Sequence, residues 1–293
     1  MLIPPDSVST EKLRLQRDSC SLKAVLLYVH PFMPKSMSGT DIFSILWSPK
    51  RVCELSYNVI FEDVGLKDYK ETWDYQAILF EELKRSKEAK AGGRLLSGSY
   101  NPGTLIFVEH PSVFTLGKSG SENNLFLNNA EIERKGASFY RIDRGGDITY
   151  HGPGQIVGYP VFDLEVLKIG LREYVSLLEE AIIRTLKEYG LEGSRFSGGT
   201  GVWLDPDVKG RARKICAIGV KASRYVTMHG FAFNVNTDLS WFNYINPCGF
   251  TDKGVTSLEN ETGIKQDIEK VKSILKEMLK EQLNLEWIQK EGR

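Results

Sequence analysis

The spacing of hydrophobic and polar residues along the chain predicts an interleaved series of strands and helices. Apolar residues that recur three and four positions apart share one face of a helix. This pattern predicts helices over residues 69–83, 171–189 and 268–283. Short apolar runs bounded by Gly, Pro or polar residues predict strands. The strands are expected at 59–64, 104–109, 138–142, 155–162, 201–203, 215–220, 225–228 and 231–235.

Breaks in the pattern mark the ends of several of these elements. Pro111 ends the strand at 104–109 because proline cannot donate to the ladder, and Gly190 stands where a left-handed residue would end the second helix. The polar, Gly- and Ser-rich stretch 84–101 is expected to be a loop. Strands and helices alternate without a strict β-α-β rhythm, which favours an α+β fold, a single domain with a mixed β-sheet flanked by helices.

Composition excludes several classes of function. Lys plus Arg and Asp plus Glu both number 38, so the net charge is zero and no global field would attract nucleic acid. No apolar run reaches the roughly 18 residues of a membrane span. The cysteines Cys20, Cys53, Cys216 and Cys248 form no CxxC pair, so we expect neither a disulfide scaffold nor a metal site. This pattern points to a reducing compartment, the cytoplasm.

The first 55 residues differ from the rest of the chain. They mix Pro, Ser, Lys and short apolar pieces without a clear period, and no cleavage site for a signal peptide follows. We expect residues 1–55 to be a poorly ordered extension or the product of an upstream start codon assigned in error, with Met37 as a candidate internal start. The catalytic domain is expected to span residues 56–290.

The densest polar and glycine-rich segment is Arg144-Gly-Gly-Asp-Ile-Thr-Tyr-His-Gly-Pro-Gly-Gln155. Glycines and a proline between two expected strands indicate a sharply turning backbone that another group approaches closely. An ordinary hairpin loop is the alternative, but a hairpin does not need this concentration of polar side chains.

A cysteine, a lysine and a histidine elsewhere in the chain are candidates for chemistry. Cys248 follows a proline and precedes a glycine, which places it on a turn, whereas Cys216 lies between Ile215 and Ala217 and is expected to be buried. Lys214 could lower the pKa of a nearby thiol. Lone lysines are usually surface charges, and a lone histidine such as His229 is more often structural than catalytic. Together these residues suggest acyl transfer through a thioester.

Other motifs fail or stay ambiguous. Gly117-Lys118-Ser119 ends like a phosphate-binding loop, but that motif requires glycine at position 112, where Ser112 stands. The segment 197–201 is expected to be a plain loop. Lys209, Arg211 and Arg213 form either a solvated loop or a basic patch that meets an acidic protein partner.

Several blocks together resemble the lipoate-protein ligase B family, the lipoyl (octanoyl) transferases. The resemblance covers about residues 57–285 and leaves residues 1–55 outside it. Besides the 144–155 segment, its blocks are Glu109-His-Pro-Ser-Val-Phe-Thr-Leu-Gly117, Gly201-Val-Trp203, Lys214-Ile-Cys-Ala-Ile-Gly219, His229-Gly-Phe-Ala-Phe-Asn234 and Asn246-Pro-Cys-Gly249.

The resemblance implies a fold, an activity and a set of site residues. The fold would be the catalytic domain shared by biotin and lipoate protein ligases. The activity would be transfer of an octanoyl or lipoyl group from acyl carrier protein to a lysine of lipoyl domains, in the 2-oxoacid dehydrogenase E2 subunits and the glycine cleavage H protein, by a monomer without a cofactor. The thiol falls on Cys248 and the lysine on Lys214. The implied substrate-binding residues are Arg144, Gly145, Gly146, Asp147, Ile148, Thr149, Tyr150, His151, Ala217, Ile218, Gly219, Gly230, Phe231 and Ala232.

The expected mechanism leaves one proton transfer and three rival functions open. Lys214 and the departing carrier thiolate are both candidates to take the proton of the acceptor lysine. An ATP-dependent lipoate or biotin ligase would share the fold but not need Cys248. A cysteine hydrolase would pair Cys248 with His229. A non-catalytic acyl-binding module would never form a covalent adduct.

Overall fold

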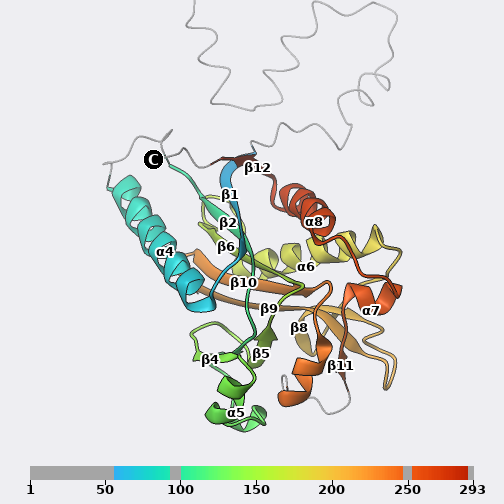
Figure 1. Ribbon diagram of the computed structural model, residues 1–293. Helices are drawn as coiled ribbons and strands as arrows, with labels where there is room; N and C mark the ends of the chain where they lie inside the picture. The colour runs from blue at the N-terminus through green and yellow to red at the C-terminus, as the bar shows by residue number, and fades with distance from the viewer. Residues whose placement is uncertain (1–55, 93–99, 247–252, 290–293) are drawn as a thin grey trace, which may run out of the picture. The chain divides into compact units, whose positions relative to one another are not determined.

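A large mixed β-sheet forms the centre of this protein (Figure 1), seen in a computed structural model that describes residues 56–92, 100–246 and 253–289. The strands β1, β2 and β12 pair in parallel, and β11 is parallel to β9, whereas the other neighbours are antiparallel. In spatial order the strands are β12 (Leu285–Ile288), β1 (Tyr57–Leu66), β2 (Gly103–Glu109), β6 (Gln155–Phe162), β10 (Val226–Asn234), β9 (Arg213–Ser223), β8 (Gly199–Leu204) and β7 (Ser194–Phe196), with β11 (Gly254–Val255) beside β9.

A smaller sheet carries the glycine-rich segment. Its strands lie in the order β4 (Ser138–Arg141), β3 (Val113–Leu116) and β5 (Ile148–His151). The segment 142–147 connects β4 to β5. The first glycines of the 144–155 segment therefore lie in this connection, before β5, and not at the tip of a hairpin. Two short elements accompany this sheet, η3 (Glu122–Asn124) and α5 (Asn129–Arg134).

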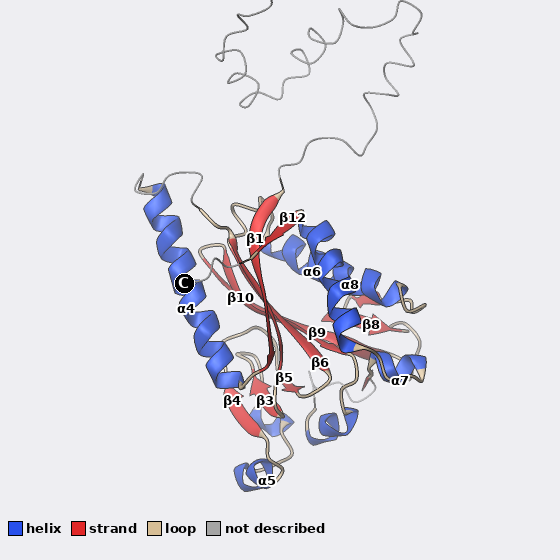
Figure 2. Cartoon of the chain, turned by 45° about the horizontal axis from the view of Figure 1, so that its top comes forward, coloured by secondary structure: helices blue, strands red, loops and turns tan. Residues whose placement is uncertain are grey.

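Helices cover both faces of the large sheet (Figure 2). On one face α6 (Leu171–Lys187) and α8 (Ile268–Leu283) pack against each other and bury apolar stripes such as Leu178, Ile182 and Leu275 in the main core. Each fully buried leucine or isoleucine contributes about 1.5–3 kcal/mol. On the other face α4 (Tyr69–Ala91) contacts β6 and β10. The remaining helical segments are η4 (Leu239–Tyr244) and α7 (Leu258–Thr262).

The mixed sheet between helices is the α+β architecture that the sequence predicts, but several boundaries differ. The stretch 84–101 is not simply a loop, because α4 continues to Ala91; Glu, Lys and Ala favour helix, and only Gly92 ends it. The expected strands 225–228 and 231–235 form one strand, β10. The segment 197–201 is not a plain loop either, since Gly199 already begins β8 in a hairpin with β7.

The remaining expectations concern Gly190, the shorter strands, residues 1–55 and membrane spans. Gly190 has the predicted positive φ, 74°, just after α6. Strands β3, β5, β7, β11 and β12 were not predicted. The predicted extension, residues 1–55, lies outside the described residues. Across residues 56–92, 100–246 and 253–289, no helix combines the length and apolarity needed to cross a membrane.

Candidate active site

A cavity of about 410 Å³ lies between the strands β6, β9 and β10 and the segment 144–151. This volume falls in the range of pockets that enclose small molecules. Lys214 lines the cavity, as do all predicted substrate-binding residues except Tyr150. These are Arg144, Gly145, Gly146, Asp147, Ile148, Thr149, His151, Ala217, Ile218, Gly219, Gly230, Phe231 and Ala232.

Tyr150 points away from the cavity because side chains alternate along β5. Its ring stacks on Trp241, with centroids 5.2 Å apart, and its hydroxyl lies 3.0 Å from Ser112 Oγ. Tyr150 therefore supports the cavity wall from behind, while Thr149 and His151 on either side of it reach the cavity.

The Arg144–Gly145 backbone crosses β9 at very close range. Gly145 donates its N–H to the carbonyl oxygen of Val220 at 3.0 Å. A Cβ on Gly219 would stand 2.9 Å from Gly145 O and 3.0 Å from Arg144 Cδ, so only glycine fits there. Gly219, which the resemblance names among the substrate-binding residues, therefore lies directly against this backbone crossing.

The failed phosphate-loop motif has a structural role beside this crossing. Backbone N–H groups of Gly117, Lys118 and Ser119 donate to carbonyl oxygens of the 144–147 segment, at 3.3, 3.0 and 3.2 Å. A Cβ on Gly117 would stand 2.3 Å from Gly146 O. The segment 117–119 thus fixes the glycine-rich segment over the sheet.

His151 is held in one tautomer by its neighbours. Gln155 donates its Nε2 to Asn234 Oδ1 at 2.8 Å, so its Oε1 accepts from His151 Nδ1 at 2.8 Å. The other ring nitrogen then carries a lone pair and accepts a long hydrogen bond, 3.5 Å, from the Thr115 hydroxyl. Burial lowers the pKa of His151 to about 3. The side chain is therefore neutral, and Tyr69 stacks on it with centroids 5.9 Å apart.

Lys214 lies at the opposite end of β9 from the Gly145 crossing. Its Nζ is 4.6 Å from the centroid of the Trp203 ring. The short strand β11 pairs here in parallel with β9, and Thr256 N donates to Lys214 O at 2.9 Å. Cys248 lies outside the described residues. The chain on either side of that segment reaches the same cavity, because Phe242 and Val255 both line it.

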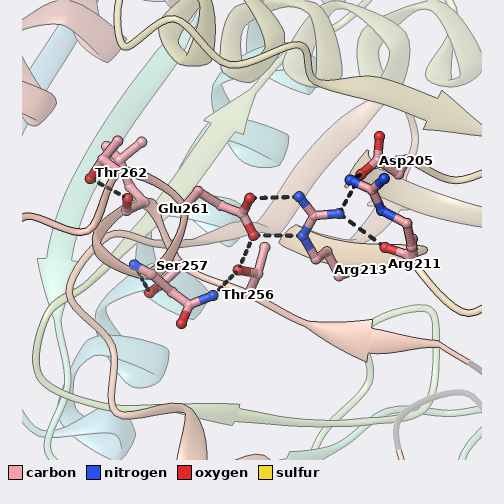
Figure 3. A network of polar contacts seen from close by, with 9 residues as sticks. Asp205, Arg211, Arg213, Thr256, Ser257, Glu261 and Thr262 are labelled. Atoms are coloured by element: carbon pink, nitrogen blue, oxygen red, sulfur yellow. Dashed lines mark hydrogen bonds and ion pairs between the residues drawn. The ribbon is translucent and has the colours of Figure 1, made fainter.

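A polar network next to Lys214 fixes the end of β9 (Figure 3). Arg213 donates from Nε and Nη2 to the two carboxylate oxygens of Glu261, at 2.6 Å each, and from Nη1 to Asp205 at 2.7 Å. The Thr256 hydroxyl donates to Glu261 at 2.6 Å. Hydrogen bonds from Arg213 lower the pKa of the Glu261 carboxyl. Because Arg211 also pairs with Asp205, acidic residues offset most of the basic patch considered from the sequence.

His229 is buried at the other end of the cavity and has a structural partner. Its Nε2 donates to Asp143 Oδ1 at 3.0 Å, and Lys221 donates to Asp143 Oδ2 at 2.5 Å. Burial lowers the pKa of His229, and the hydrogen bond from His229 is the main reason that the pKa of Asp143 lies well below its usual range. Val220, the ladder partner of His229, stands six residues beyond Lys214 on β9. At 3.3 Å per residue, about 20 Å along β9 separate the backbone of Lys214 from that of Val220.

Cys216 is the one cysteine among the described residues. It is fully buried in the main core, and burial raises the pKa of its thiol. It therefore behaves as the small hydrophobic residue that the sequence predicts.

Some cavity residues were not predicted from the sequence. Tyr69 and Val175 have the spacing of apolar residues on a helix, which predicts core positions. Phe242 and Val255 lie in segments without any motif. Asn234 ends a recognised block, and its link to Gln155 is a contact across the sheet. Gln155 carried a signal as one of the polar residues of the glycine-rich segment, and so did Gly198, Gly199 and Thr200, which line the cavity although the segment 197–201 was expected to be a plain loop.

Comparisons with known proteins agree with this geometry. Residues 68–280 match the family described as the Lipoyl protein ligase A/B catalytic domain. The chain is 56% identical over 221 residues to an octanoyltransferase of Parabacteroides distasonis, covering 75% of this chain and 96% of that relative. It is 54% identical over 222 residues to an octanoyltransferase of Flavobacterium johnsoniae, covering 75% of this chain and 94% of that one.

Solved structures show the same fold at low sequence identity. A lipoate-protein ligase A bound with ATP superimposes with a TM-score of 0.56 at 15% identity, covering 80% of this chain and 89% of that one. A bipartite lipoate protein ligase of Thermoplasma acidophilum gives a TM-score of 0.54 at 15% identity, with 80% and 86% covered. The predicted fold and family resemblance are confirmed, and this chain belongs to the Lipoyl protein ligase A/B catalytic domain family.

Proposed function

We propose that this protein is an acyltransferase that moves an octanoyl group from acyl carrier protein to a lysine of lipoyl domains, in lipoate biosynthesis, through a thioester on Cys248. The similarity to octanoyltransferases at more than half identity supports the reaction. One observation carries the choice of nucleophile: the described chain before and after Cys248 lines the same cavity as Lys214, through Phe242 and Val255.

In the first step the Cys248 thiolate attacks the carbonyl carbon of the donor thioester. The carbon–sulfur bond to the carrier breaks, and the carrier leaves as a thiolate. Lys214 stabilises the thiolate form of Cys248, because a nearby ammonium lowers the pKa of a thiol. The octanoyl chain occupies the cavity beneath the 144–151 segment, where each buried methylene contributes about 0.8 kcal/mol.

In the second step the amine of the acceptor lysine attacks the acyl-cysteine and releases the Cys248 thiolate. The acceptor must lose a proton, which passes either to the departed carrier thiolate directly or to Lys214 after Lys214 has given its own proton to that thiolate. Lipoyl domains of 2-oxoacid dehydrogenase E2 subunits and the glycine cleavage H protein are the proposed acceptors. The proposed enzyme acts as a cytoplasmic monomer, where reducing conditions keep Cys248 a free thiol.

The position of His229 argues against a cysteine hydrolase. Its Nε2 is committed to Asp143. Its backbone lies about 20 Å along β9 from Lys214, beside which the proposed Cys248 thiolate acts. A histidine that activates a cysteine must be within hydrogen-bond reach of it, about 2.6–3.2 Å.

Reconstituted transfer tests the proposal. Octanoyl-acyl carrier protein and an unmodified lipoyl domain are mixed with the protein without ATP, and the acceptor is weighed by mass spectrometry. Octanoylation is expected with wild type and not with Cys248→Ala. Lys214→Met is expected to shift the pH profile of acylation upward by about one to three units. Lys209→Met, which removes an exposed lysine of the nearby 205–212 loop, is the matched control and should leave that profile unchanged.

A different pair of substrates would reveal the ATP-dependent alternative. If octanoylation requires free octanoate and ATP and releases pyrophosphate, and Cys248→Ala retains it, the proposed mechanism is wrong.

A further inference from the structure

A tryptophan and a lysine face each other across two neighbouring strands beside the cavity. Trp203 on β8 and Lys214 on β9 are direct ladder partners in an antiparallel pair. Side chains of directly opposed residues lie on the same face of a sheet, with Cβ atoms about 4.5–5.5 Å apart. The Lys214 Nζ accordingly lies 4.6 Å from the centroid of the Trp203 ring. An aromatic face attracts an ammonium at this distance.

The Trp203 ring is held in one orientation by its own hairpin. Trp203 is 2% exposed, and its Nε1 donates to Gly199 O at 3.2 Å. The Phe196 ring packs against it, with centroids 5.3 Å apart and planes at 61°. Because all three residues belong to the β7–β8 hairpin, the ring always presents the same face to Lys214.

The lysine side chain, in contrast, is long and flexible. Its ammonium sits on a four-carbon stem, and holding such a stem in one rotamer costs conformational entropy. The contact with the Trp203 ring offsets part of this cost and restricts where Nζ can lie. Lys214 lines the cavity and Trp203 does not. The ring therefore contacts the ammonium without occupying the space for a substrate.

An aromatic ring fixes an ammonium without cancelling its charge, since the ring carries no net charge. A carboxylate in the same place would weaken the effect of the ammonium on a nearby thiol. Three carboxylates pack around this strand pair, and arginines bind them. Arg213 binds Asp205 and Glu261, and Arg195 binds Glu179, which also accepts a backbone N–H of β8.

We infer that Trp203 is a positioning residue that holds the charged Lys214 side chain in place for acyl transfer. This inference rests on the proposed role of Lys214 and goes beyond it, because it assigns a function to a residue outside the cavity lining. A residue that acts only in packing would affect acylation whether or not Lys214 is present. The effect of Trp203 must instead pass through Lys214.

The test compares variants with and without an aromatic face. Trp203→Leu and Trp203→Met are apolar but have no such face, whereas Trp203→Phe keeps one and loses the hydrogen bond to Gly199. Each substitution is made in the wild-type chain and in Lys214→Met. Trp287→Leu is the control, because Trp287 lies on β12 at the opposite edge of the sheet. The rate of octanoyl adduct formation on each protein is measured by intact-protein mass spectrometry as a function of pH.

Loss of the aromatic face should slow acylation. At neutral pH, Trp203→Leu and Trp203→Met should be about two- to thirtyfold slower than wild type, the factor expected for a lost cation–π contact. Their pH midpoint should move upward, by less than in Lys214→Met. Trp203→Phe should recover most of the rate, and Trp287→Leu should match wild type. In the Lys214→Met background the three Trp203 substitutions should change neither rate nor midpoint, because the lysine through which they act is gone.

The results separate this inference from the proposed function. Absence of an adduct on wild type, or a wild-type rate and midpoint in Lys214→Met, refutes the proposed function and the inference with it. If both of these controls behave as proposed, a wild-type rate in the two aliphatic Trp203 variants overturns the inference alone. Equal rates in Trp203→Phe and Trp203→Leu, an equal loss of rate with and without Lys214, or failure of both aliphatic variants to fold, as judged by circular dichroism, also overturns it.

Discussion

The polar network beside Lys214 predicts that Glu261→Gln weakens both the fold and the site. Glu261 accepts three short hydrogen bonds, two from Arg213 and one from the Thr256 hydroxyl, all at 2.6 Å. Glutamine keeps the volume but replaces one acceptor oxygen with an NH₂ group, which then faces the Arg213 Nη2 donor. One charge-assisted bond is lost and two donors oppose each other.

The expected cost follows from the burial of this pair. The side chain of Glu261 is 11% exposed and that of Arg213 is 26% exposed, so water can replace the lost bond only in part. Hydrogen bonds to charged groups contribute about 1.5–3 kcal/mol, so we expect the free energy of unfolding to fall by about 2 kcal/mol. Because the network fixes β11 against Lys214, octanoyl transfer should also slow.

The assay is urea unfolding followed by circular dichroism, together with single-turnover transfer. Glu259→Gln is the matched control, since Glu259 lies on the same helix and its side chain makes no hydrogen bond to any described residue. Its effect should stay within about 0.5 kcal/mol. Equal stability and equal transfer rates for the two variants would refute the reasoning.

Three further predictions concern the cavity wall and a buried histidine, His110, next to it. Gly219→Ala should reduce transfer more than stability, because the new Cβ would stand 2.9 Å from Gly145 O and displace the segment above the cavity; a wild-type rate in a kinetic assay would contradict this. Gln155→Leu should lower the free energy of unfolding by about 1–3 kcal/mol, because it leaves buried polar groups of its neighbours unpaired; urea titration measures this, and an unchanged midpoint refutes it. Burial lowers the pKa of His110 to about 4 and of His151 to about 3. Below an unfolded pKa of 6.5 the unfolded chain binds more protons, so stability should fall with pH from 6.5 toward 5, by up to about 1.4 kcal/mol per unit for each histidine. Flat unfolding midpoints across that window would contradict it.

Long periodic elements could be predicted from the sequence because they bury one face. The stripes of α6 and α8 and the apolar strands β2 and β6 have this property, and all lie close to where they were expected. Most of the cavity wall was also named in advance, through the family resemblance and not through the hydrophobic pattern. At Gly219 the structure supplies the physical reason, because a Cβ there would stand 2.9 Å from Gly145 O.

What the sequence did not predict depends on tertiary contacts. Strand β12 is short and pairs with β1 from the far end of the chain. Strand β10 continues through His229 despite its positive φ, because Gln76 on α4 accepts the N–H of His229. Tyr69 reads as a core position of an amphipathic helix, and only the fold places its ring on His151. No local sequence pattern predicts these contacts.

The central claim is that an acyl group is carried on Cys248. Intact-protein mass spectrometry after mixing the protein with octanoyl-acyl carrier protein, without an acceptor, tests it most directly. We expect a gain of one octanoyl group that hydroxylamine removes and that is absent from Cys248→Ala. A wild-type preparation that transfers octanoyl groups to a lipoyl domain yet never shows this adduct, or a Cys248→Ala variant that shows it equally, would contradict the account.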